Sequence, residues 1–189
     1  MDKGRQDLAA LIKGGVTALE ITVDSPESFE IIQRLARKYG DQAVIGAGTV
    51  LDGQTARMAI HHGAEFIFSP NLKQDVIQTA LRYGKQPVPG IFTPTEIVQA
   101  VEWGAQLVKL FPASSVGANF IKDVMAPLPH VSIIPTGGVN LENAAEFIAA
   151  GAVAVGIGRN LVPSWDDYEG IESRAREYVA LIQAARNRS

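Results

Sequence analysis

Short apolar runs alternate along the chain with longer segments in which apolar positions recur every three or four residues. The short runs predict buried strands, and the longer segments predict amphipathic helices. The expected strands are 18–23, 43–47, 66–68, 87–91, 107–111, 131–134 and 152–157. Strands that are apolar throughout and alternate with helices are typical of a parallel sheet covered by helices.

The helical segments carry start and stop signals. The expected helices are about 7–13, 26–39, 53–62, 72–83, 94–103, 119–125, 141–150 and 171–186. Ser25-Pro26 is interpreted as an N-cap with a first-turn proline, Thr93-Pro94-Thr95-Glu96 as a capping box, and Asn140 as an N-cap. We therefore expect one α/β domain that spans residues 1–189.

A weak internal repeat relates equivalent positions on different predicted strands. Gly15, Gly63, Gly104 and Gly151 each end a predicted helix, and the residues five positions later are Glu20, Phe68, Lys109 and Gly156. In a (β/α)8 TIM barrel, inward-pointing residues of alternate strands share one layer. Glu20 and Lys109 are thus expected to point into the interior, near one another. Polar residues at strand ends along the whole chain favour the barrel over a doubly wound open sheet.

The strand count is one short of a closed barrel. The pattern predicts seven strands, whereas the barrel needs eight. Because the first predicted element is a helix that precedes a strand, the absent first strand is expected before Met1. The alternative is a barrel that stays open at this seam.

Composition narrows the function classes. The net charge is −3 with basic residues spread along the chain, so nucleic acid and membrane surfaces are not expected partners. The chain has no cysteine, which excludes disulfides and thiolate chemistry and fits a cytoplasmic protein. It has three histidines, two of them adjacent at His61 and His62, and no metal site is expected.

Lys109 is the most informative single residue. It lies within Leu107-Val108-Lys109-Leu110-Phe111-Pro112, an otherwise apolar predicted strand. A buried ammonium is costly without a partner, and a lysine that loses its proton is a nucleophile toward carbonyl carbon. The alternative is an edge-strand lysine that points to solvent, but the apolar neighbours on both sides favour burial.

The other candidates lie where predicted strands end, on the face where barrels form active sites. Glu20 could supply acid–base chemistry, or form an ordinary salt bridge. Thr49 either lines the site or sits in a tight turn. Gly137-Gly138 and Gly158-Arg159 follow the last two strands, where barrels often bind phosphate through backbone N–H groups.

Several motifs together resemble one enzyme family. They are Leu19-Glu20-Ile21-Thr22, Ile45-Gly46-Ala47-Gly48-Thr49-Val50, Phe68-Ser69-Pro70, Pro89-Gly90, Thr93-Pro94-Thr95-Glu96, Lys109-Leu110-Phe111-Pro112 and Pro135-Thr136-Gly137-Gly138-Val139. Their order resembles the 2-keto-3-deoxy-6-phosphogluconate / 4-hydroxy-2-oxoglutarate aldolase family, which includes the 2-keto-3-deoxy-6-phosphogalactonate aldolases. The match extends from Gly14 to Val162. The resemblance implies a (β/α)8 barrel, a homotrimer, a lysine Schiff base, and neither metal nor cofactor.

The resemblance also implies residue roles. Lys109 matches the imine-forming lysine and Glu20 the acid–base residue. Residues that match the pyruvyl pocket are Thr49, Pro70, Phe111 and Thr136, and those that match the phosphate site are Gly137 and Gly138. Asp24 replaces an arginine that usually engages the substrate carboxylate, and Gly158-Arg159 replaces a Gly-x-Ser phosphate motif.

The expected function is reversible cleavage of a 2-keto-3-deoxy (phospho)sugar acid or of 4-hydroxy-2-oxoglutarate. The products would be pyruvate and an aldehyde, either glyceraldehyde 3-phosphate or glyoxylate. Two alternatives remain open. One is a barrel isomerase or epimerase, which needs a base but no imine, and the other is a barrel that only binds a phosphorylated acid.

Overall fold

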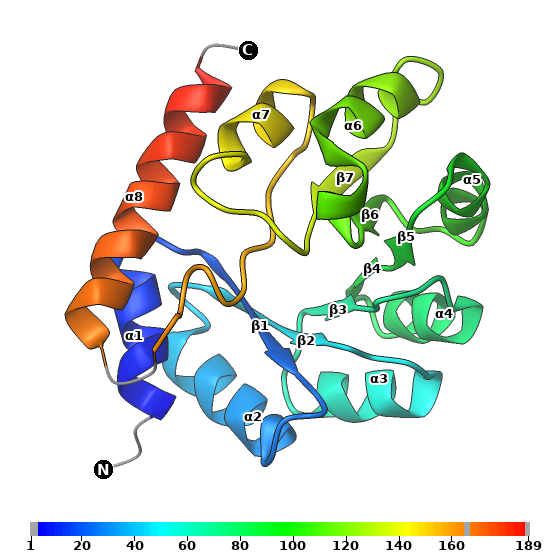
Figure 1. Ribbon diagram of the computed structural model, residues 1–189. Coiled ribbons are helices and arrows are strands. Elements are labelled where there is room, and N and C mark those ends of the chain that lie inside the picture. The colour runs from blue at the N-terminus through cyan, green and yellow to red at the C-terminus, as the bar shows by residue number, and fades with distance from the viewer. Residues whose placement is uncertain (1–3, 165–166, 188–189) are drawn as a thin grey trace.

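Strands surrounded by helices make up the computed structural model, which describes residues 4–164 and 167–187 (Figure 1). The strands are β1 (Ala18–Thr22), β2 (Val44–Gly48), β3 (Phe66–Phe68), β4 (Gln86–Val88), β5 (Gly90–Ile91), β6 (Leu107–Leu110) and β7 (Ser132–Pro135). The helices are α1 (Gly4–Lys13), α2 (Ser28–Tyr39), α3 (Gly53–His61), α4 (Gln74–Arg82), α5 (Pro94–Glu102), α6 (Gly117–Met125), α7 (Ala144–Ala149) and α8 (Tyr168–Arg186). A 3₁₀ turn, Ala113–Ser115, follows β6.

The strands pair in parallel and in chain order. One run is β1-β2-β3-β4 and the next is β5-β6-β7. The helices form a ring outside these strands (Figure 1). This is the architecture of a (β/α)8 barrel, as the sequence predicts. The barrel is not closed by strand pairing, because among the described residues no strand links β1 to the segment 152–157.

Two predicted strands differ from the observed ones. The strand 87–91 is divided at Pro89 into β4 and β5, because a proline has no N–H to give to a ladder. The strand 152–157 is reduced to one parallel bridge between Thr136 and Gly156, supported by a 2.9 Å hydrogen bond from the Gly156 N–H to the Pro135 carbonyl. In the described residues this segment pairs with β7 alone, so only one of its edges is held.

One predicted helix start is wrong and another is displaced. Ser25 does not cap α2, because its hydroxyl lies 2.8 Å from the Thr22 hydroxyl in a turn, and α2 begins only at Ser28. Asn140 makes the hydrogen bonds of an N-cap, because its side-chain oxygen accepts from the N–H groups of Glu142 and Asn143 and its carbonyl accepts from the Ala144 N–H, but the regular helix α7 begins only at Ala144. Short polar side chains favour turns as readily as caps, so sequence alone does not fix where the helix begins. The capping box at Thr93 and Glu96 is confirmed.

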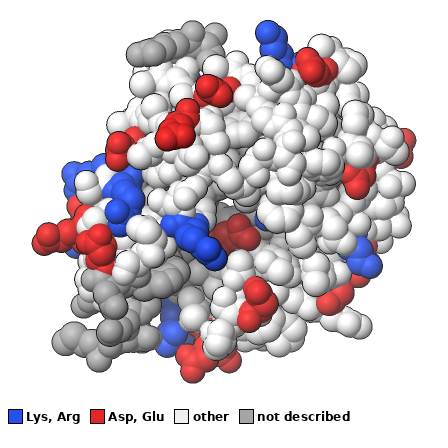
Figure 2. Space-filling model, in the orientation of Figure 1, with Lys and Arg blue, Asp and Glu red and all other residues white. Residues whose placement is uncertain are grey.

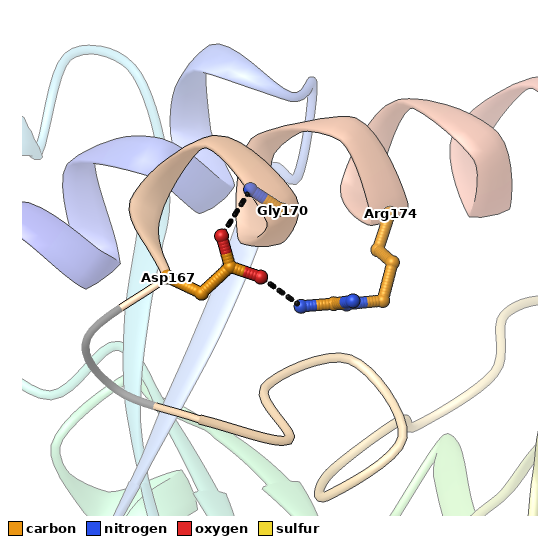
Figure 3. Close-up of polar contacts among 3 residues, drawn as sticks. All are labelled: Asp167, Gly170 and Arg174. Carbon is orange, nitrogen blue, oxygen red and sulfur yellow. Dashed lines mark hydrogen bonds and ion pairs between the residues drawn. The ribbon is translucent and has the colours of Figure 1, made fainter.

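The N-terminus of α8 is fixed by a side-chain cap (Figure 3). One carboxylate oxygen of Asp167 accepts a 2.9 Å hydrogen bond from the Gly170 N–H, and the other accepts one of 3.2 Å from Arg174. Acidic caps suit helix N-termini because unpaired N–H groups and the helix dipole both favour negative charge there. The helix begins at Tyr168, slightly before the predicted residue 171.

Candidate active site

Lys109 lies on β6 with its side chain in the barrel interior, and only 6 % of the residue is exposed. Its strand neighbours in the sheet are Gly90 of β5 and Ile134 of β7, neither of which carries charge. Burial lowers the pKa of Lys109, and the negative charge of Glu20 partly opposes this effect. The prediction of a buried lysine is confirmed, and the edge-strand alternative is wrong.

Glu20 lies on β1 and is the charged partner of Lys109. Burial raises the pKa of its carboxyl, whereas the positive charge of Lys109 lowers it. No ion pair or hydrogen bond joins the two side chains in the described part of the chain, so they interact through space. Burial favours the neutral form of each group, which is the protonated carboxyl of Glu20 and the deprotonated amine of Lys109. Because each charge also affects the pKa of the other group, the two titrate as a coupled pair.

The position of Glu20 depends on a glycine that the sequence reasoning did not select. A Cβ atom at Gly48 of β2 would lie 1.6 Å from a Glu20 carboxylate oxygen. Any side chain at position 48 would therefore displace the carboxylate. The motif Gly46-Ala47-Gly48-Thr49 contained this signal, since a strand glycine often marks a close approach by another group.

Aromatic rings flank the lysine. The Lys109 Nζ atom lies 4.9 Å from the Phe111 ring centroid and 5.3 Å from that of Phe68. Phe111 was expected at the site by resemblance. Phe68 was placed in the same layer as Lys109 by the glycine repeat, but no role was predicted for it.

The two predicted phosphate loops lie side by side. Gly137 and Gly138 have left-handed backbones with φ of 87° and 82°, which glycine adopts without strain. The Asn160 side chain donates a 2.8 Å hydrogen bond to the Val139 carbonyl, and so joins the Gly158-Arg159 loop to this turn. A Cβ at Gly137 would lie 3.1 Å from the Phe111 ring, so this turn borders the ring that lies beside Lys109.

The remaining predicted pocket residues are placed less directly. The buried Thr136 hydroxyl has no hydrogen-bond partner within the described ranges and lies against Gly156. Thr49 has φ of 59°, a strained value for a β-branched residue that persists only where the surroundings enforce it. The backbone of Pro70 lies against Gly90, in the space that a side chain at position 90 would fill. The structure gives Thr49, Pro70 and Arg159 no hydrogen bond or ion pair to Lys109.

Figure 2 shows a hollow near the middle of one face, with acidic and basic side chains beside it. A separate hollow of about 600 Å³ lies between α3 and α4, lined by residues such as Arg57, Met58 and Tyr83. It contains none of the predicted site residues. Among the described residues, no group of three or more His, Asp or Glu side chains could hold a metal ion. None of the described helices combines the length and apolar character needed to cross a membrane.

These features define a (β/α) barrel with a buried lysine–glutamate pair, and comparisons with known proteins agree. A 2-dehydro-3-deoxy-6-phosphogalactonate aldolase of Escherichia coli strain K12 is 36 % identical over 186 residues, which are 98 % of this chain and 89 % of that protein. The solved structure described as native KDPGal has a TM-score of 0.93 at 35 % identity, with 97 % of this chain and 90 % of that chain covered.

A third similarity concerns the chemistry. A KDPG aldolase from Legionella pneumophila, solved with pyruvate captured at low pH as a covalent carbinolamine intermediate, has a TM-score of 0.82 at 25 % identity. The match covers 97 % of this chain and 87 % of that chain. The family described as KDPG and KHG aldolase matches residues 2–173. The chain belongs to this aldolase family, and it is therefore a carbon–carbon lyase.

Proposed function

We propose that the chain is a class I aldolase that cleaves a 2-keto-3-deoxy (phospho)sugar acid through an imine on Lys109. The observation that carries the proposal is a buried lysine with a lowered pKa, beside a carboxyl group with a raised pKa. Such opposed shifts suit a pair that exchanges protons with a substrate near neutral pH. The carbinolamine captured in the Legionella aldolase supports a covalent route.

The proposed reaction begins at the neutral amine. The Lys109 nitrogen attacks the C2 carbonyl carbon of the keto acid, and the carbinolamine takes up one proton from solvent and loses water to give a protonated imine. The Glu20 carboxylate then takes the proton of the C4 hydroxyl. The C3–C4 bond breaks, its electrons form the enamine, and the aldehyde leaves.

The second half of the reaction releases pyruvate. Glu20 returns its proton to C3 of the enamine, which restores the imine. Water then hydrolyses the protonated imine to pyruvate and the neutral lysine. This step replaces the water lost earlier and returns to solvent the proton taken up when the imine formed. One carboxyl group is sufficient because it accepts and donates the proton in different steps.

Two residues bear on the choice of substrate. Asp24 lies in the turn after β1, and a negative charge there disfavours a nearby substrate carboxylate. Arg159 is exposed in the loop beside Gly137-Gly138, and its guanidinium suits a phosphate or a second carboxylate. We propose that the 6-phosphorylated acids of the gluconate or galactonate series are preferred over 4-hydroxy-2-oxoglutarate, which would yield glyoxylate.

A panel of keto acids tests this proposal. Pyruvate release from the two phosphorylated acids, their dephosphorylated forms and 4-hydroxy-2-oxoglutarate would be measured for the natural chain, for Arg159→Ala and for Arg159→Ser. Because serine at this position is the family's usual phosphate ligand, Arg159→Ala is the variant that removes the contact. We expect it to raise KM for the phosphorylated acids by about tenfold, the size of one charge-assisted hydrogen bond, with little effect on neutral-tailed substrates and with binding partly restored in Arg159→Ser. Binding of these acids without release of pyruvate would support the non-catalytic alternative instead.

We also propose the homotrimer that the family resemblance implies. Met58 and Tyr83 are 47 % and 43 % exposed and line the hollow between α3 and α4, and exposed apolar groups gathered in this way favour contact between proteins. Light scattering is expected to give about three times the chain mass of 20.2 kDa. Met58→Glu should lower this mass, whereas the matched change Val153→Glu should not, and a 20.2 kDa natural chain would contradict the proposal.

A further inference from the structure

The surroundings of Lys109 contain one residue that the proposed reaction does not use. Phe68 is 8 % exposed on β3, and its ring centroid lies 5.3 Å from the Lys109 Nζ atom. Phe111, which follows β6, lies 4.9 Å from the same atom. A cation within about 6 Å of an aromatic face is attracted by the negative face of the ring.

The Phe68 ring is held in place by a second aromatic ring. Phe66, two residues earlier on the same strand, contacts it with centroids 5.2 Å apart and planes at 61°, the edge-to-face arrangement that aromatic pairs favour. The Phe66 ring in turn fills the space over Gly46, where a Cβ atom would lie 2.3 Å from it. The strand β3 thus provides both the ring beside the lysine, Phe68, and the ring that packs against it, Phe66.

Few other groups can stabilise a positive charge at this point. The described residues give Lys109 no hydrogen bond or ion pair from its side chain, and Glu20 on β1 is the charged group that acts on it. Its neighbours on the adjoining strands, Gly90 and Ile134, are uncharged. The two rings, at 4.9 and 5.3 Å from the nitrogen, therefore join Glu20 as groups that favour the charged form of the lysine.

We propose that Phe68 is a positioning residue that, together with Phe111, stabilises the positively charged states of Lys109. Those states are the ammonium of the free enzyme and the protonated imine of the reaction. The second of these rests on the proposed function, but the first does not. Phe68 thus keeps the lysine nitrogen at a fixed place in a pocket whose burial alone would disfavour every cationic form.

The test replaces Phe68 with phenylalanines carrying one, two and three fluorine atoms, which weaken the negative ring face while nearly preserving its shape. Titration of Lys109 is followed by NMR of the ¹³Cε-labelled lysines, with Lys109→Ala assigning the signal. The titration midpoint should fall stepwise with each fluorine, by about 0.5–1 pH unit in total. The same series at Phe66, which contacts Phe68 and is not one of the two rings over the Lys109 Nζ atom, is the matched control and should leave the midpoint nearly unchanged.

A second readout separates this inference from the proposed function. In the fluorinated series, at subsaturating pyruvate, the fraction of protein trapped by borohydride should stay nearly constant below the Lys109 midpoint, where ammonium and protonated imine lose the same stabilisation. Above the midpoint, where the protonated imine forms from the neutral amine, this fraction should fall about three- to tenfold. An unchanged midpoint, with unchanged trapping above it, along the Phe68 series overturns the role of Phe68. Absence of any adduct in the natural protein overturns the imine mechanism instead, while the titration still decides whether Phe68 stabilises the ammonium.

Discussion

Lys109→Ala is expected to abolish release of pyruvate from every keto acid, by about 10⁴-fold or more, and to eliminate borohydride-trapped adducts. The reason is that the proposed reaction passes through a covalent bond between Lys109 and the substrate. Without an amine at position 109 no imine forms, and the C3–C4 bond has no electron sink. The remaining pocket can still bind the substrate, so binding should persist while chemistry is lost.

The measurement is the intact mass of the protein after incubation with pyruvate and borohydride. The natural chain should gain the mass of one reduced pyruvyl group, located at Lys109 by peptide mapping. Lys85→Ala is the matched control, because Lys85 forms a surface ion pair with Glu65 at 2.6 Å and lies outside the site. An adduct retained in Lys109→Ala, or one mapped to another lysine, would contradict the mechanism.

The lowered pKa of Lys109 also predicts how pH affects stability. The unfolded chain binds a proton more tightly here than the folded chain does. Between the lowered folded pKa and the ordinary value of 10.5, stability of the natural chain therefore rises with pH. Below that window, burial of the ammonium costs stability in full. Lys109→Met should accordingly unfold at a higher temperature than the natural chain near neutral pH, and this advantage should shrink as pH rises through the window.

The sequence predicted the pairing of Lys109 with Glu20 because a periodic feature encodes it. A glycine ends each helix and the strand follows at a fixed spacing, so equivalent positions share an orientation. The same spacing placed Phe68 in the lysine layer, and the observed 5.3 Å contact agrees with it. Spacing gives the orientation of a side chain but not its distance from side chains on other strands, which is why the roles of Phe68 and Gly48 emerged only from the structure.

Polar residues that signal a helix start were less dependable predictors, because the same residue can form either a helix cap or a separate turn. Ser25 forms a turn where a helix start was expected, because a short polar side chain forms hydrogen bonds in a turn as readily as at a cap. The last expected strand is shorter for a different reason. Residues 152–157 have the apolar pattern of a strand, but in the described part of the chain they have a pairing partner on one side only. Tertiary neighbours, which the sequence pattern omits, decide both cases.

Glu20→Gln is expected to lower turnover by about 10²–10⁴-fold while the borohydride adduct with pyruvate still forms. Glutamine keeps the shape of the side chain but cannot accept the C4 hydroxyl proton. Trapping of pyruvate needs the amine alone, so it should survive. The raised pKa of Glu20 adds a pH signature, because cleavage by the natural chain should fall as pH drops through that value and the carboxylate becomes protonated.

Gly48→Ala tests the same carboxylate by its position. A Cβ at residue 48 would lie 1.6 Å from a Glu20 oxygen, so the carboxylate must move although its charge is kept. We expect a turnover loss of about 10²-fold, since small displacements of a catalytic group are costly, with trapping retained as in Glu20→Gln. Gly84→Ala is the matched control, because its φ of 65° makes alanine strained while no atom lies within 4 Å of the added carbon. If Gly48→Ala cleaves the substrate as fast as Gly84→Ala does, the carboxylate of Glu20 does not act from the place where the fold holds it.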